Sequence, residues 1–267
     1  MKRATRTRKI FAVISSFFFF LSALFLLLVE IGNTHDKTVL RDTWFMKLDL
    51  SHIVPTSIPN ATLLNSIAQT LGLHDFYQVG LWNFCEGYIN EGVTQCSHPQ
   101  SLYWFNPVEI LLNELFAGAT IAIPEEALKY LDILKVASQW MFGLFLTGTC
   151  LSTTLIFLTP LAVYTRWAAG PIAILSLFTL LCIFVACIIA TAIFIVFKIA
   201  LTQVDDLNIK AVLGAQMFGF MWTSAGCILI AFIIQKLGSK KAYTMPPDGD
   251  PEKQTFKQRL GFGRSQA

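Results

Sequence analysis

Charged residues are scarce in this sequence. Only 14% of the 267 residues are Asp, Glu, Lys or Arg, and 54% are apolar, whereas an average soluble domain has about 25% charged residues. The formal net charge of +3 at pH 7 is too small to indicate a nucleic-acid-binding protein. This composition therefore predicts a membrane protein.

Four long apolar segments carry almost no charge, namely residues 10–30 (which end on Glu30), 140–164, 170–197 and 211–235. Each is long enough to cross a bilayer core of about 30 Å as a helix. The first could instead be a signal peptide, because five basic residues precede it. Its apolar run exceeds the about 7–15 residues of a signal peptide, and no small-residue cleavage site follows. We therefore expect four transmembrane helices.

The sequence shows no ionisable residue inside these segments apart from Glu30 at an edge, which argues against an ion or proton pathway. No Ser/His/Asp or paired-carboxylate arrangement and no zinc-like Cys/His spacing is visible. The histidines all fall in the long loop between the first two segments, at His35, His52, His74 and His98. We expect no enzymatic activity, no cofactor and no metal.

Basic residues are distributed unevenly around the four segments. Residues 1–9 carry five Lys/Arg and no acid, the connection 165–169 holds Arg166, and the tail 236–267 carries seven Lys/Arg. The positive-inside rule therefore places these three regions in the cytoplasm and the loops 31–139 and 198–210 outside. The tail is polar and is expected to be disordered. Asn60 stands in an Asn-Ala-Thr sequon, a predicted glycosylation site in the outer loop.

Cysteine is almost absent from the predicted outer regions. Cys150, Cys182, Cys187 and Cys227 lie in apolar segments, where we expect small buried hydrophobic side chains. Cys85 and Cys96 are the two cysteines of the outer loop. An even number of cysteines in an oxidising compartment predicts a disulfide between them.

The outer loop also shows strand patterns. In residues 44–50, apolar side chains alternate with Lys47 and Asp49, which predicts a half-buried strand. We expect a second strand at 76–85, paired through a turn at Asn90–Glu91 with a strand at 92–96, so that Cys85 lies opposite Cys96. Trp82 would either plug the place where the sheet meets the helices or contact a partner. A helix starting at residue 124 is expected to continue into the segment at 140.

Gly80-Leu81-Trp82, with Cys85 three residues on and then Cys96, resembles the signature of the claudin superfamily. The longer runs 76–88, 96–99 and 103–108 are similar to the fungal Sur-seven/PalI family of plasma-membrane proteins. The resemblance implies a mainly α membrane protein, in which a four-transmembrane-helix bundle carries a small disulfide-stapled extracellular β-sheet.

The resemblance also implies a role. Family members are non-enzymatic plasma-membrane proteins that organise cortical domains near eisosomes and support cell-wall organisation and endocytosis. The alternative is a membrane regulator or sensor acting through the extracellular loop, as in PalI-like pH sensing, channel regulation or cell fusion. The expected partners are membrane lipids, further copies of the chain and other proteins of the membrane domain, and no nucleic acid.

Basic residues flank the first and last apolar segments on the predicted cytoplasmic side, and each can attract anionic lipids of the inner leaflet. Positive-inside insertion alone could also explain them. The candidate lipid-contact residues are Lys2, Arg3, Arg6, Arg8, Lys9, Lys236, Lys240 and Lys241.

Overall fold

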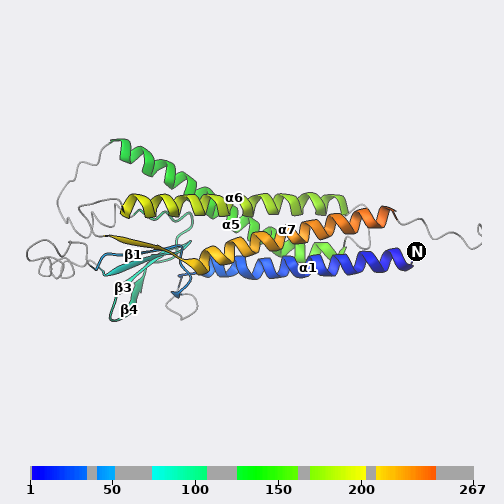
Figure 1. Cartoon of the computed structure of the whole chain (residues 1–267), viewed down its shortest axis with the longest axis horizontal. Helices are drawn as coiled ribbons and strands as arrows, with labels where there is room; N and C mark the ends of the chain where they lie inside the picture. Colours follow the sequence, from blue (N-terminus) through cyan, green and yellow to red (C-terminus); the bar gives the residue numbers. More distant parts are fainter. Residues whose placement is uncertain are drawn as a thin grey trace, which may run out of the picture.

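A computed structural model describes residues 2–34, 41–51, 74–106, 125–161, 169–202 and 209–244. Long helices run side by side and carry a small sheet at one end (Figure 1). The helices are α1 (Lys2–Ile31), α5 (Glu125–Leu161), α6 (Ala169–Thr202) and α7 (Ala215–Thr244).

Each helix contains a stretch that is long and apolar enough to span a membrane. These stretches are Lys9–Ile31, Leu131–Leu161, Gly170–Thr202 and Ala215–Gly238. The predicted four-helix membrane architecture is therefore confirmed. The expected helix starting near residue 124 also runs without a break into the second span, because α5 begins at Glu125.

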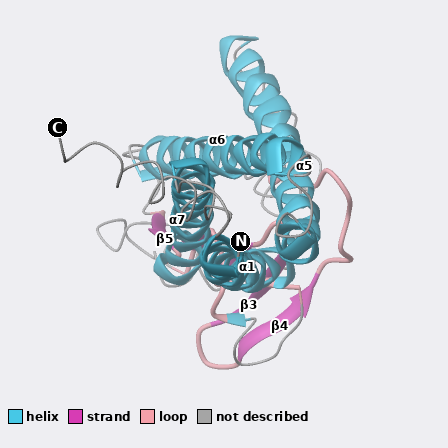
Figure 2. Cartoon of the chain, turned by 90° about the vertical axis from the view of Figure 1, so that its right-hand side faces the viewer, coloured by secondary structure: helices cyan, strands magenta, loops and turns pink. Residues whose placement is uncertain are grey.

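Seen along its axis, the bundle is a ring in which α1 lies next to α7 and α5 lies next to α6 (Figure 2). Small residues allow close helix contact in membranes, and Ala186 and Ala190 are fully buried on α6. Ala215 and Gly219, which have the same spacing on α7, are exposed and face away from the bundle.

The sheet is antiparallel, with strand order β4-β3-β2-β1-β5. The strands are β1 (Met46–Asp49), β2 (Phe76–Val79), β3 (Phe84–Tyr88), β4 (Gly92–Cys96) and β5 (Lys210–Leu213). Met46 and Leu48 are buried while Lys47 and Asp49 are partly exposed, so the alternation predicted for β1 is confirmed. Cys85 lies opposite Cys96 in the β3–β4 register, as expected.

The prediction of one strand over 76–85 was wrong. β2 and β3 are separate strands joined by a tight turn at Gly80–Asn83, in which the Gly80 N–H donates to the Asn83 carbonyl at 2.9 Å. The turn presses against the end of α1. A Cβ on Gly80 would lie 2.9 Å from the Asn33 Cβ and 3.0 Å from the Gly32 oxygen, so only glycine fits there.

The start predicted for the fourth span at residue 211 was also wrong. Residues 210–213 form β5, which pairs with β1, and the helix begins at Ala215. Hydropathy alone cannot separate a short apolar strand from the first turn of an apolar helix. Here the Gly214 N–H donates to the Phe45 carbonyl at 2.9 Å, which fixes the change from strand to helix.

Some sequence predictions fall outside the described residues. These are the glycosylation site at Asn60, the histidines His35 and His52, the cytoplasmic turn around Arg166 and the tail beyond Thr244.

Candidate functional site

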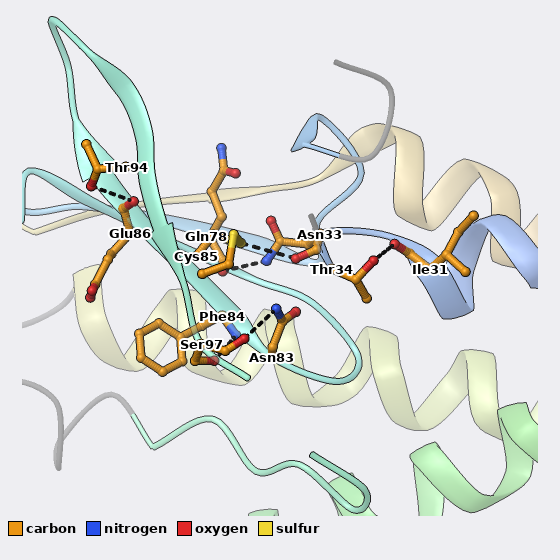
Figure 3. The surroundings of a disulfide bond; sticks show 11 residues. Ile31, Asn33, Thr34, Gln78, Asn83, Phe84, Cys85, Glu86, Thr94 and Ser97 are labelled. Atoms are coloured by element: carbon orange, nitrogen blue, oxygen red, sulfur yellow. Dashed lines mark hydrogen bonds between the residues drawn. A yellow bond between two sulfur atoms is a disulfide. The ribbon is translucent and has the colours of Figure 1, made fainter. Parts of the chain in front are cut away.

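The family-like Gly-Leu-Trp motif lies where the sheet meets the helices. We define the sheet–helix junction as the end of α1 (residues 30–34), the turn at 80–83, the disulfide between β3 and β4, and the facing part of α5 at Phe142 and Thr149. Figure 3 shows the part of this junction around the disulfide.

The end of α1 is capped by Asn33. Its φ of 59° is the left-handed conformation that commonly ends helices. The next residue, Thr34, donates to the Ile31 carbonyl through its N–H at 3.3 Å and its hydroxyl at 2.6 Å. The fully buried Asn33 side chain donates through Nδ2 to the Gln78 carbonyl at 2.9 Å. The cap therefore ties α1 to β2.

The disulfide between Cys85 and Cys96 is present, as predicted. The Cys85 Sγ lies 3.1 Å from the Asn33 carbonyl oxygen. Because a bridged sulfur carries no hydrogen, this is a polar contact and not a hydrogen bond. Asn83 Nδ2 donates to the Ser97 carbonyl at 3.0 Å, next to the bridge. The Cys85 sulfur thus contacts the residue that caps α1, and the Asn83 side chain connects the turn to the residue that follows β4 (Figure 3).

Trp82 joins the turn to two helices. Its indole N–H donates to Glu30 Oε2 on α1 at 3.0 Å. Its ring meets the Phe142 ring of α5 edge-on, with 4.6 Å between centroids, a favourable arrangement for aromatic pairs. Trp82 is partly buried against the core. Of the two interpretations from the sequence, the structure shows the plug between sheet and helices.

Glu30 lies at the end of the first span, as its position in the sequence suggested, because α1 and the span both end at Ile31. It lies within α1 and is only 7% exposed. Glu30 Oε1 is 3.4 Å from the Thr149 hydroxyl, whose oxygen is also 2.8 Å from the Phe145 carbonyl. A hydroxyl has one hydrogen, so Thr149 can donate to Glu30 only if it gives up its hydrogen bond to the Phe145 carbonyl. Trp82 is therefore the best-placed donor to Glu30 among the described residues.

One feature of the sequence points indirectly to the Glu30–Trp82 pair. A buried Trp needs an acceptor for its N–H, but the acceptor is 52 residues away along the chain. An acid at the edge of an apolar run is the usual mark of a membrane boundary, so the sequence pattern does not identify Glu30 as this acceptor.

The far side of the sheet carries a partly desolvated cation. The Lys47 Nζ lies 3.8 Å from the centre of the Phe76 ring, within the range of a cation–π interaction. Burial lowers the pKa of Lys47, and the charges of Asp49 and Asp42 act in the opposite direction. Phe76 also packs with Cys85 and Val93, next to the disulfide.

The described residues offer little for catalysis. His74 Nδ1 is 3.6 Å from Glu86 Oε2, and no group of three His, Cys, Asp or Glu residues in these parts of the chain could hold a metal ion. The predicted lipid-contact residues lie at the other end of the molecule, on the continuous helical backbones of α1 and α7.

Replacing Gly80 with alanine is expected to destabilise the fold by about 1–3 kcal/mol, a typical cost of overpacking. The new Cβ would meet the Gly32 backbone oxygen at 3.0 Å, which cannot move without shifting the end of α1. Thermal unfolding of the purified protein in detergent measures the loss. The control is Gly219→Ala, where a Cβ meets no atom within 4 Å. Equal melting temperatures for the two variants would contradict the close contact.

The comparisons with known proteins agree with this architecture. Residues 11–234 match the SUR7/PalI family. The chain is 28% identical over 177 residues to the SUR7 family protein pun1 of Schizosaccharomyces pombe, a match covering 62% of this chain and 60% of that protein. It is 25% identical over 156 residues to Protein PUN1 of Saccharomyces cerevisiae, covering 54% and 59%. The chain thus matches about three fifths of the length of these relatives.

The family match includes the four membrane-spanning segments, the sheet and the junction between them. The chain belongs to the SUR7/PalI family of multi-pass membrane proteins.

Proposed function

We propose that the protein is a non-enzymatic organiser of cortical domains in the plasma membrane, associated with eisosomes, and that it supports cell-wall organisation and endocytosis. Further copies of the chain and other proteins of the domain are the proposed partners. Family membership and the fungal relatives support this role.

One observation carries the proposal, namely that all four described helices hold the sheet in place. α1 holds it through Asn33 and Glu30, and α5 through Phe142. α7 continues directly from β5. α6 packs against β5, and its Phe194 ring stacks on the Phe45 ring beside β1, with 4.8 Å between centroids. Because these contacts surround the motif, the sheet has a fixed orientation relative to the helix bundle. A surface that is already ordered suits a protein that assembles laterally with its neighbours, because binding then costs little further conformational entropy.

The proposed orientation places the sheet outside the cell and both termini in the cytoplasm. The basic ends of α1 and α7 lie at the end of the bundle away from the sheet (Figure 1), and basic residues favour the cytoplasmic side. The disulfide favours an oxidising compartment for the sheet.

A fluorescently tagged copy is expected to form stable patches in the plasma membrane that recover slowly after photobleaching, because an assembled scaffold exchanges slowly. The matched control is an unrelated four-span plasma-membrane protein with the same tag. Uniform fluorescence that recovers as fast as the control would contradict the proposal.

A regulator or sensor acting through the sheet is the second candidate. β4 lies at an edge of the sheet, and a groove of about 290 Å³ runs beside it, lined by Thr34 and by residues 93–99. Edge strands can accept an added strand from a partner. Co-purification of a stoichiometric partner, lost on Thr94→Pro, would favour this candidate, whereas assembly of the chain with itself alone would count against it.

A further inference from the structure

The two helix ends farthest from the sheet project together beyond the rest of the bundle. Figure 1 shows α1 and α7 continuing past the ends of α5 and α6. They pack closely there, since a Cβ on Gly238 of α7 would lie 2.9 Å from the Phe11 Cβ of α1. Slightly farther in, the Ser15 hydroxyl donates to the Ala231 carbonyl at 3.0 Å.

These ends lie at the depth of lipid headgroups. The spans end at Lys9 and Gly238, and the helices continue to Lys2 and Thr244. Six or seven further residues extend a helix by about 10 Å at 1.5 Å per residue. The headgroup layer adds about 5–8 Å on each side of the hydrocarbon core. The projecting turns therefore occupy the headgroup region and its boundary with water.

The basic residues of α1 continue its lipid-facing stripe. That stripe is exposed by 42% to 64% at every position and recurs at steps of three and four, through Ile10, Val13, Phe17, Phe20, Leu24, Leu27 and Ile31. Arg6 lies four residues before Ile10, and Arg3 lies three residues before Arg6, so both fall on the same helix face. Lys2 and Lys9 fall beside them. Arg8 instead shares the face of Phe11, which meets α7.

α7 repeats this arrangement. Ile230, Ile233 and Leu237 are exposed at the same helical spacing, and Lys240 comes three residues after Leu237. Lys236 is exposed beside this stripe, with its Nζ 5.4 Å from the centre of the Phe232 ring. Neither projecting end contains an Asp or Glu. Two adjacent helices thus carry basic residues at positions that continue their exposed apolar stripes, and the sequence places no acidic residue among them.

We propose that these ends form a binding site for a polyanionic lipid headgroup of the polyphosphoinositide class, contacted by Lys2, Arg3, Arg6, Lys9, Lys236 and Lys240. Arg binds phosphate oxygens in a bidentate manner, and cations on two helices can engage several phosphates of one headgroup. The assignment to the inner leaflet rests on the proposed orientation. Such a site would add specific lipid recruitment to the proposed role in membrane domains.

The test is a titration of the full chain in detergent with dioctanoyl phosphatidylinositol bisphosphate. The variant Arg3→Gln/Arg6→Gln/Lys236→Gln/Lys240→Gln is expected to bind about tenfold or more weakly, because each basic residue near a headgroup contributes measurably. The control, Lys253→Gln/Lys257→Gln/Arg259→Gln/Arg264→Gln, removes the same number of charges beyond α7 and should change affinity by less than about twofold. Melting temperatures equal to that of the unaltered protein establish that both variants fold.

Three results would overturn the site: equal loss in both variants, no loss in either, or equally tight binding of dioctanoyl phosphatidylserine. Inositol trisphosphate binding as tightly as the lipid would overturn the assignment to a membrane lipid. Because detergent leaves both ends accessible, this test does not depend on orientation. Terminal tags reached by antibody on intact cells would overturn the orientation alone.

Discussion

Replacing Cys85 with serine is expected to abolish delivery of the protein to the cell surface. Closing so short a loop, with a sequence separation of 11, contributes about 2–3 kcal/mol in the chain-entropy model. The change also disturbs a fully packed position, since Cys85 is 2% exposed and touches the end of α1. Cys96 would be left as a free thiol. Surface labelling of intact cells measures the loss.

Cys150→Ser is the matched control for this prediction. Cys150 is an unbridged cysteine on the exposed side of α5, so its replacement should leave surface labelling unchanged. Normal delivery of both serine variants would show that the disulfide is dispensable for folding and export.

Replacing Trp82 with phenylalanine is expected to cost about 1–3 kcal/mol, the usual penalty for leaving a buried polar group without its partner. The ring can still meet Phe142, but the donor 3.0 Å from Glu30 is lost. Trp82→Ala also removes the aromatic packing, and large core truncations of this kind cost about 3–5 kcal/mol. Thermal unfolding of the purified protein in detergent ranks the variants.

A double-mutant cycle with Glu30→Gln tests whether the two residues act together. Glutamine is uncharged and can donate as well as accept, so losing the indole N–H should cost less in this background than beside Glu30. Trp140→Phe, at a position 65% exposed, should have little effect. Additive effects of Trp82→Phe and Glu30→Gln would rule out the pair as a coupled unit.

The parts of the fold that the sequence predicted are those set by local patterns. Four uncharged segments of membrane length became four helices, and the alternation around Lys47 became β1. The β3–β4 hairpin also follows local chemistry. Its turn ends on Gly92, whose φ of 84° favours glycine, and this turn brings Cys85 opposite Cys96.

The parts that could not be predicted depend on contacts distant in the sequence. Residues 76–85 have continuous strand character, and the turn at Gly80 that divides them packs against the end of α1, which is distant in the sequence. β5 is apolar enough to begin a helix, but it pairs with β1 more than 160 residues earlier. Glu30 is buried because Trp82 reaches it from the sheet. Single-sequence patterns carry no information about these partners.

The Glu30–Trp82 pair also changes how the motif is understood. Gly80 permits the close approach of the turn to α1, and Trp82 then bonds to Glu30, one residue before the end of that same helix. The motif therefore fixes the sheet on the bundle, while β4 forms an edge of the sheet and is the surface available to the proposed partners. This division agrees with the proposed scaffold role, in which the outer surface keeps a constant orientation.

The most direct test of a disulfide-closed sheet on the helix bundle is peptide mapping of the unreduced, alkylated protein by mass spectrometry. We expect a single linked pair, Cys85 with Cys96, and alkylated thiols at Cys150, Cys182, Cys187 and Cys227. Recovery of Cys85 and Cys96 as alkylated free thiols would contradict a disulfide-closed outer sheet seated on the end of α1.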